Sequence, residues 1–167
     1  MKATIKFEDG REFAVDVNEE TLKDILYVEK NGYERSDVRC EYYYVNTNEV
    51  CKGYDLQESI ANNHYKSANY YSTAELAEMN AKADVLKYKL RRFSVENRTD
   101  DLGWGSGKTK YCIGYNHGKH QLEIFSDTTI QRSEETYFDT EQAAKGAINK
   151  FKEELNWYFT EYRDSIK

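Results

Sequence analysis

The sequence has no proline, only three cysteines and no long apolar run. A membrane-spanning helix needs about 20 consecutive apolar residues, so we expect no contact with a membrane. The three cysteines are an odd number, and their spacing is not that of a disulfide framework. Both features favour a reducing compartment. The first residues, M-K-A-T-I-K-F-E-D-G, alternate and carry charge, so we expect no signal peptide. These features together predict a cytoplasmic protein.

Motifs for catalysis and metal binding are also missing. The sequence contains no G-x-S-x-G elbow, no local Cys/His signature and no C-x-x-C pair. His117 and His120 lie three residues apart in an expected hairpin turn. A zinc site needs two further ligands, and the turn does not supply them. Residues 103–109 (G-W-G-S-G-K-T) place the first glycine one residue too close for a phosphate loop, and no helix follows. We expect a non-enzymatic protein with no cofactor and no metal.

Length, charge and apolar content limit the remaining classes. A chain of 167 residues forms one domain or two small ones, and 39% hydrophobic residues are enough to build a core. The formal net charge of -6 argues against a protein whose whole surface binds nucleic acid. The 15 tyrosines therefore have to be divided between a core and a contact surface.

Two stretches predict amphipathic helices, at residues 70–93 and 137–162. In each, apolar residues recur at spacings of three and four, which places them on one face of a helix. These positions are Leu76, Met79, Ala83, Leu86, Leu90 and Phe93 in the first stretch and Ala144, Ile148, Phe151, Leu155, Tyr158 and Tyr162 in the second. The aromatic end of the second helix suits either a core or a partner-binding surface.

The beginnings of the two helices repeat one pattern. The matching residues, at one constant offset, are Tyr70, Thr73 and Ala77 in the first and Tyr137, Thr140 and Ala144 in the second. We expect Ser72 to cap the first helix, with Glu75 three residues later. We expect Asp139 to cap the second helix, with Gln142 in the same role.

Alternating apolar and polar residues predict three β-hairpins. The first covers residues 2–17 and turns at Asp9-Gly10, and a short helix over residues 18–31 should follow. The second lies within residues 39–52, and the third joins residues 110–115 to 121–125. Residues 53–69 receive no assignment.

The order of these elements predicts an α+β fold. Antiparallel β-hairpins are each followed by a helix, in ββα units, with the helices packed on one face of the sheet. We expect two parts, an N-terminal hairpin-helix unit at residues 1–35 and a main α+β domain at residues 36–167. The main domain should contain two related hairpin-helix units.

Acidic residues form the first candidate binding surface. Glu8, Asp9 and Glu12 lie in the first hairpin, and Glu134 and Glu135 precede the last helix. Such a surface can imitate a phosphate backbone and fill a basic groove of a partner, although an ordinary soluble acidic surface has the same composition. The tip of the glycine-rich loop adds one aromatic residue to this partner-binding set, Trp104.

Basic residues at the end of the first long helix form the alternative surface. They are Lys87, Lys89, Arg91 and Arg92, with Tyr88 between them. Lysine, arginine and an aromatic residue in this pattern are typical of contacts with phosphates and bases. Cations near a helix C-terminus are also favourable without any ligand, because they complement the helix dipole.

The repeated helix entry resembles small accessory proteins of phages and prophages in Gram-positive bacteria. The matching segments are Tyr70 to Thr73, Leu90 to Asn97 (L-R-R-F-S-V-E-N), Trp104, Lys110 to Tyr115 (K-Y-C-I-G-Y) and Tyr137 to Thr140. The resemblance covers roughly residues 40–162 and carries no catalytic residue. It implies a protein that works in the cytoplasm of a bacterial host cell.

In that setting, the resemblance implies an anti-CRISPR or related anti-defence inhibitor that binds a host protein, with an RNA-guided nuclease as the leading candidate. Such a DNA mimic would use acidic and tyrosine-bearing surface. Two alternatives remain open at this point. One is a nucleic-acid-binding accessory protein that uses residues 82–92, and the other is a structural phage protein that self-associates through its aromatic surface.

Overall fold

The computed structural model describes residues 2–6, 12–16, 32–35, 39–99, 103–104, 107–133 and 135–163. It confirms the α+β class, with antiparallel sheets and helices. Strands β1 (Lys2–Lys6) and β2 (Glu12–Asp16) pair antiparallel, as the first hairpin predicts. The expected turn at Asp9-Gly10 and the expected helix at residues 18–31 lie outside the described residues.

The second hairpin belongs to a small unit that we call the hairpin module. It consists of β3 (Glu41–Asn46), β4 (Glu49–Tyr54) and α2 (Ser59–Lys66). Tyr42 and Tyr44 lie on one face of β3, and they pack with Ala61 of α2 and with Tyr70 in one core cluster. The rings of Tyr42 and Tyr70 stack 4.4 Å apart and nearly parallel. Tyrosines therefore supply most of the apolar surface of this core.

The segment before the long helix extends the β3–β4 sheet. Tyr71 exchanges two backbone hydrogen bonds with Tyr43, each of 2.8 Å. The side-chain amide of Asn69 continues this edge, because it accepts from the Val45 N–H and donates to the Val45 carbonyl, both at 2.8 Å. The outer edge of β3 is thus satisfied by residues that lead directly into the long helix.

The buried carboxylate of Asp55 connects three segments that flank the elements of the hairpin module. Asp55 has no exposed surface, and its two oxygens accept from Arg35 Nε at 2.6 Å and from the second guanidinium nitrogen at 2.8 Å. The Gln57 N–H and the Tyr70 hydroxyl also donate to this carboxylate, at 2.8 and 3.1 Å. Arg35 donates in addition to Asn62 of α2 at 2.7 Å. Arg35 lies at the end of the predicted N-terminal unit but is anchored in the main domain.

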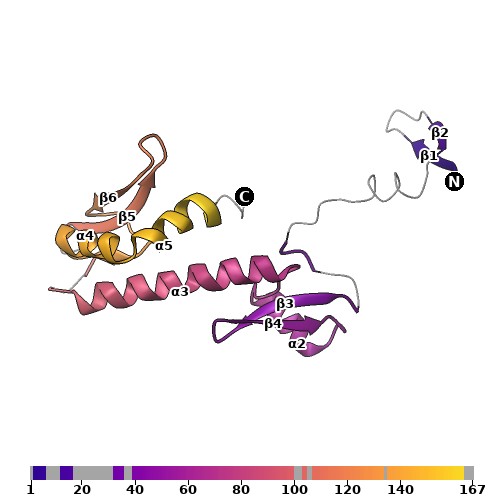
Figure 1. Cartoon of the computed structure of the whole chain (residues 1–167), viewed down its shortest axis with the longest axis horizontal. Coiled ribbons are helices and arrows are strands. Elements are labelled where there is room, and N and C mark those ends of the chain that lie inside the picture. Colours follow the sequence, from indigo (N-terminus) through magenta and orange to yellow (C-terminus); the bar gives the residue numbers. More distant parts are fainter. Residues whose placement is uncertain are drawn as a thin grey trace.

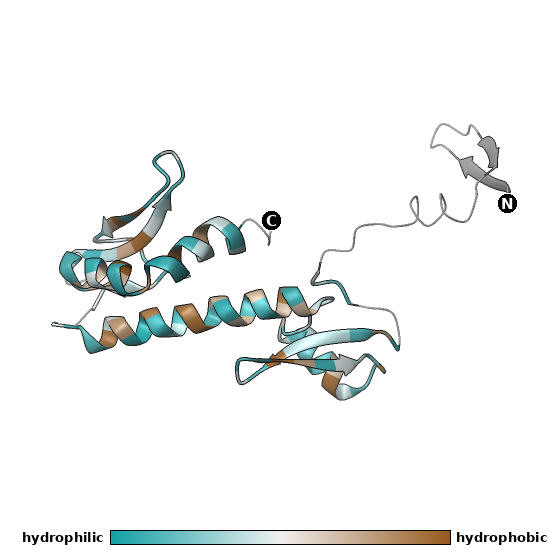
Figure 2. Ribbon diagram, viewed as in Figure 1, coloured by the Kyte–Doolittle hydropathy of each residue, from teal (hydrophilic) through white to brown (hydrophobic). Residues whose placement is uncertain are grey.

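Helix α3 (Ala74–Glu96) is the longest element and separates two groups of neighbours (Figure 1). One side contacts β3 and β4, and another contacts the elements near the C-terminus. Apolar and polar residues alternate along the visible side of α3 (Figure 2), as expected of a helix with neighbours on more than one side. Small residues allow the close approach, since Ala77 and Ala83 have no exposed surface.

The remaining elements form the C-terminal module. It contains β5 (Lys110–Asn116), β6 (Gln121–Asp127) and β7 (Tyr137–Phe138), in the order β6-β5-β7, with α4 (Glu141–Lys150), α5 (Lys152–Trp157) and the π-helix η1 (Tyr158–Tyr162). The core cluster consists of Leu86, Phe138, Ala144, Ala147, Phe151 and Leu155. One sheet face, with Ile113 of β5 and Ile124 of β6, packs against it. The helices thus cover that face.

The side chain of Asn80, in α3, connects segments that are far apart in the sequence. Its Oδ1 accepts from the Tyr162 hydroxyl at 2.9 Å. The same amide exchanges hydrogen bonds with the Tyr33 hydroxyl, at 3.1 and 3.3 Å. Asn80 also donates to the Leu76 carbonyl, which fixes the orientation of the amide.

Several predictions at the level of elements are wrong. Residues 137–138 form β7 and not the start of a helix, because Tyr137 and Phe138 pair with Cys112 and Tyr111 of β5. The last helix is interrupted at Phe151, whose φ of -118° and ψ of 26° are not helical. Hydrogen bonds from Phe151 to Ala147 and from Leu155 to Phe151 span this interruption, so the chain bends without leaving the helical path. Helix α2 received no prediction at all.

Both predicted N-caps are wrong by one residue. Thr73 Oγ1 accepts from the Leu76 N–H at 3.2 Å, and Thr140 Oγ1 accepts from the Ala143 N–H at 3.1 Å. Threonine at these positions has the extended backbone that an N-cap needs. The predicted cap Asp139 instead accepts from the Thr99 hydroxyl at 2.7 Å.

We expect Thr140→Ala to lower the free energy of unfolding by about 1 kcal/mol, because an N–H of the first turn loses its acceptor. Thr140→Ser keeps the hydroxyl and should have a smaller effect. Ser72→Ala, at the position before the Thr73 cap, should change stability by less than about 0.5 kcal/mol. Urea unfolding followed by circular dichroism measures these differences, and a larger loss for Ser72→Ala than for Thr140→Ala would contradict the assigned caps.

The buried ion pair predicts a specific acid sensitivity. Hydrogen bonding to Arg35, opposed by burial and assisted by Gln57 and Tyr70, lowers the pKa of Asp55 from 3.8 to about 2. This stabilisation is present above the pKa of an unfolded aspartate and is lost as the pH falls from about 4 towards 2. It amounts to about 2 kcal/mol.

Unfolding free energies measured from pH 2 to 7 test this prediction. Asp55→Asn should be less stable at neutral pH, and it should lose less further stability between pH 4 and 2 than the unaltered chain. Asp84→Asn is the matched control, since Asp84 is exposed and pairs only with Lys87 within the described residues. An acid limb of unchanged size in Asp55→Asn would show that another group is responsible.

Candidate binding surfaces

The structure describes few of the predicted acidic contact residues. Glu8, Asp9 and Glu134 lie outside the described residues. Glu12 lies in β2, for which the backbone alone is described. Only Glu135 and Trp104 of this set have described side chains. The predicted acidic surface therefore stays a prediction.

Glu135 and Trp104 are brought together around Tyr137. Glu135 pairs with Arg132 at 3.1 Å and accepts from the Tyr137 hydroxyl at 2.8 Å. The Trp104 ring lies edge-on to the Tyr137 ring, with 5.0 Å between centroids. Both residues are partly buried. Both residues are engaged with Tyr137 within the chain, so only part of each is available to a partner.

The contacts of Glu135 also change the pKa values of this region. Burial opposes ionisation of Glu135, but hydrogen bonds from Tyr137, Cys112 and Arg132 outweigh it and lower the pKa. Burial, with a further contribution from Glu135, raises the pKa of Cys112 to about 12. The Cys112 thiol therefore stays protonated, and this cysteine is a poor nucleophile.

Acidic neighbours neutralise most of the predicted basic surface on α3. Lys87 pairs with Asp84 at 3.3 Å, Lys89 with Glu154 of α5 at 2.6 Å, and Arg92 with Glu96 at 2.7 Å. Arg91 is exposed and makes no ion pair with any described residue. Each pairing lowers the positive potential that attracts a phosphate backbone. The arrangement gives the nucleic-acid interpretation less support than the sequence alone.

An exposed apolar surface surrounds α2 and was missed by the sequence analysis. We call Leu56, Ile60 and Tyr65 the α2 surface. These residues are 51%, 63% and 44% exposed, and they lie in α2 or just before it. Leu56 lies before α2, which begins at Ser59, so no helical spacing of apolar residues indicated this surface. The eight residues of α2 are also too few for such a pattern to stand out.

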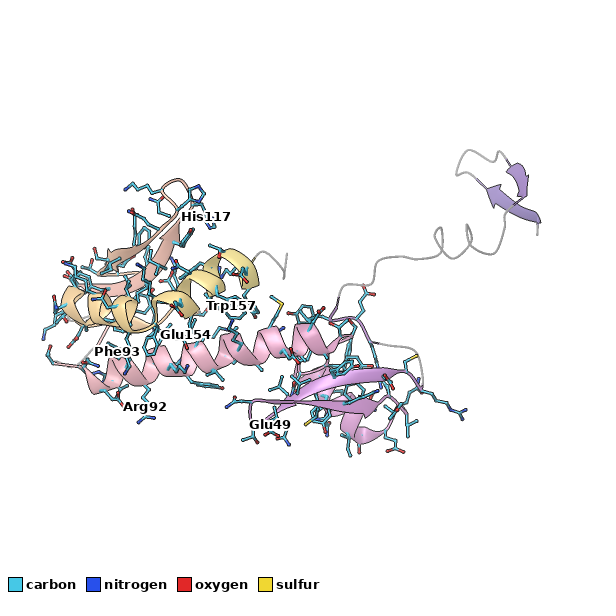
Figure 3. The ribbon with its side chains drawn as sticks, viewed as in Figure 1. Glu49, Arg92, Phe93, His117, Glu154 and Trp157 are labelled. Atoms are coloured by element: carbon cyan, nitrogen blue, oxygen red, sulfur yellow. The ribbon has the colours of Figure 1, made fainter. Side chains whose placement is uncertain are left out.

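A cleft of about 470 Å³ lies where α3, α5 and the β3–β4 turn meet. We call it the α3–α5 cleft. Its lining residues are Asn48, Glu49, Val50, Glu78, Ala81, Lys82, Val85, Leu86, Lys89, Glu154 and Trp157. Glu154 and Trp157 lie on the α5 side of α3, and Glu49 lies on the side of the hairpin module (Figure 3). The cleft thus has an apolar floor and charged walls.

The described residues offer no group of three or more His, Cys, Asp and Glu side chains placed to hold a metal ion. His117 and His120 lie at the exposed β5–β6 turn, where His117 contacts the Tyr115 ring at 5.1 Å (Figure 3). Within the same residues, no helix has both the length and the apolar composition to cross a membrane.

Comparison of the chain with models of protein families, with curated protein sequences and with solved structures finds no match.

The ion pairs on α3 predict how nucleic-acid binding responds to mutation. In Glu96→Gln/Glu154→Gln, Arg92 and Lys89 lose their partners and become available to phosphates. We expect tighter binding to single-stranded DNA at low salt than for the unaltered chain. The slope of log K against log salt should steepen by about 0.7 for each freed contact.

Fluorescence anisotropy over a range of salt concentrations measures both quantities. The matched control is Glu153→Gln/Glu161→Gln, which removes the same charge at two exposed positions that make no ion pair with described residues. An equal gain in the control would indicate a net-charge effect and not the release of Lys89 and Arg92.

Proposed function

We propose that this chain is a non-enzymatic, protein-binding inhibitor encoded by a phage or another mobile element, and that it acts on a host defence nuclease. The observation that carries the binding role is the exposure of three large apolar residues, Leu56, Ile60 and Tyr65, in α2 or just before it. Single exposed apolar residues are ordinary, but several together are typical of contact sites. Aromatic residues are enriched where proteins meet.

The α2 surface has a fixed base, which favours a specific contact. On the inner side of α2, Ala61 is buried, and Asn62 accepts from Arg35. His64 stacks on Tyr44 with 4.2 Å between centroids, and its Nδ1 lies 2.9 Å from the Tyr42 hydroxyl. A surface held in this way loses little conformational entropy on binding.

The type of partner comes from the resemblance of the repeated Y-[YF]-x-T helix entry to phage accessory proteins. An RNA-guided nuclease, as in anti-CRISPR inhibition, is the partner that this setting favours. The net charge of -6 agrees with a target that binds nucleic acid through a basic groove.

Cleavage assays with a panel of RNA-guided nucleases, at an excess of the purified chain, test the proposal. We expect inhibition of at least one nuclease. Leu56→Asp/Ile60→Asp should weaken that inhibition at least tenfold, because the complex would then bury two charged side chains in place of two apolar ones. The control is Val95→Asp/Ile130→Asp, which makes the same change at two exposed apolar residues outside the α2 surface.

Four outcomes count against the proposal. Unchanged cleavage throughout the panel would remove the inhibitor function. An equal loss in both double variants would remove the α2 surface as the contact. Binding of the chain to DNA at low salt, with no binding to the nuclease, would favour the nucleic-acid alternative, and a stable oligomer in sedimentation would favour self-association.

A further inference from the structure

We propose that the outer edge of β6 pairs with β6 of a second copy of the chain, antiparallel and centred on Ile124, so that the two sheets become continuous. This inference concerns the C-terminal module, whereas the α2 surface belongs to the hairpin module. It rests on an open strand edge, on side chains that leave this edge uncovered, and on charges that fit one register.

Strand β6 is an edge strand with a regular backbone. The sheet order β6-β5-β7 places it at one end, and every residue from Gln121 to Asp127 pairs with β5 in one register without a bulge. Among the described residues, none outside β5 forms a backbone hydrogen bond with β6. The N–H and C=O groups on the outer side are therefore a template for another strand.

The sequence of β6 lacks the residues that usually protect a strand edge. Q-L-E-I-F-S-D contains neither the proline nor the lysine that natural edge strands often carry. Its two carboxylates already have partners within the chain. Glu123 pairs with Lys119 at 3.0 Å, and Asp127 Oδ1 accepts from the Thr129 and Ile130 N–H groups at 2.8 and 2.9 Å. Both negative charges are thus partly compensated before a second strand approaches.

The large side chains of β6 point away from its outer edge. Leu122 and Ile124 pack against the core cluster of the C-terminal module. The Phe125 ring lies against Gly114 of β5, since a Cβ at Gly114 would be only 2.7 Å from that ring. A second strand can therefore reach the β6 backbone without displacing a large side chain.

Charge selects one register for the pairing. Opposite residues of an antiparallel pair share a face, so a two-fold pairing of β6 with itself is centred on a single residue. A centre at Glu123 places this carboxylate against its own copy, and a centre at Phe125 places Glu123 against Asp127. Like charges directly opposite are destabilising. A centre at Ile124 avoids both arrangements and overlaps the whole strand. The facing pairs are then Ile124–Ile124, Glu123–Phe125, Leu122–Ser126 and Gln121–Asp127.

A single pair of strands makes a weak contact, because it buries less surface than the roughly 1,200–2,000 Å² of a stable complex. Two copies that each carry a net charge of -6 also repel one another. We therefore expect a reversible dimer at high protein concentration, and we expect it to strengthen as salt screens the repulsion. Such a dimer differs from the stable oligomer that would count against the inhibitor.

Sedimentation velocity of the full chain over a range of protein concentrations tests the register. Phe125→Glu places a carboxylate opposite Glu123 of the second copy, and Phe125→Lys places an ammonium group there. Both variants lose the same phenyl ring, so each is the control for the other. Because the pair occurs twice in a dimer, we expect dissociation constants that differ roughly tenfold, with Phe125→Lys the tighter.

Further controls separate the β6 contact from general repulsion and from other surfaces. Val95→Glu and Val95→Lys make the same changes of net charge at an exposed residue of α3, and their dissociation constants should differ by less than about twofold. Leu56→Ser/Ile60→Ser, on the α2 surface, should dimerise as the unaltered chain does. Hydrogen exchange requires no mutation, since the β6 amides of the unaltered chain should exchange more slowly as its concentration rises.

The inference is overturned by any one of several results. These are a chain that stays monomeric at every concentration, equal dissociation constants for Phe125→Glu and Phe125→Lys, an equally large difference between the two Val95 variants, loss of the dimer in Leu56→Ser/Ile60→Ser, unchanged exchange in β6, and assembly beyond a dimer, because a two-fold contact closes. A monomeric chain can still inhibit a nuclease through the α2 surface, so the two proposals fail separately.

Discussion

The hairpin module depends on the ion pair between Arg35 and Asp55. A carboxylate without exposed surface is tolerated only when its oxygens are satisfied, and Arg35, Gln57 and Tyr70 donate to Asp55 from three different segments. Arg35 carries this connection further by donating to Asn62. The position of α2, and with it the α2 surface, follows from one fully paired buried charge. Tyrosines suit this core because their rings pack and their hydroxyls complete the network.

Local sequence signals predicted the hairpins, the long helix α3 and the helical character of the segment that forms α4, α5 and η1. The turns at Asn46 to Asn48 and at residues 116–119 are flanked by alternating residues, and β3–β4 and β5–β6 form there. Helix boundaries were less predictable. Ser72 and Asp139 have side chains that suit an N-cap, but so do the residues that follow them, Thr73 and Thr140. Before the later helix, Tyr137 pairs with Cys112 of β5, and this long-range contact cannot be read from the local sequence pattern.

Long-range contacts also limited the prediction of binding residues. The pairs Asp84–Lys87 and Arg92–Glu96 have helical spacing and are readable from the sequence. Lys89 and Glu154 are 65 residues apart, and Lys82 contacts Trp157 across an even larger separation. The sequence alone therefore overestimated how many basic residues of this stretch are available to a phosphate. The α3–α5 cleft had no signal in the sequence, since its walls come from three separate segments.

The shared amide of Asn80 has a consequence for how the chain opens. It bonds to Tyr33, which precedes the hairpin module in the sequence, and to Tyr162 of η1 in the C-terminal module. Although the two modules have separate cores, detachment of either tyrosine removes a partner from the same side chain. Local opening near Tyr33 thereby weakens protection near Tyr162, and the reverse, so we expect hydrogen exchange to treat the two modules as one cooperative unit.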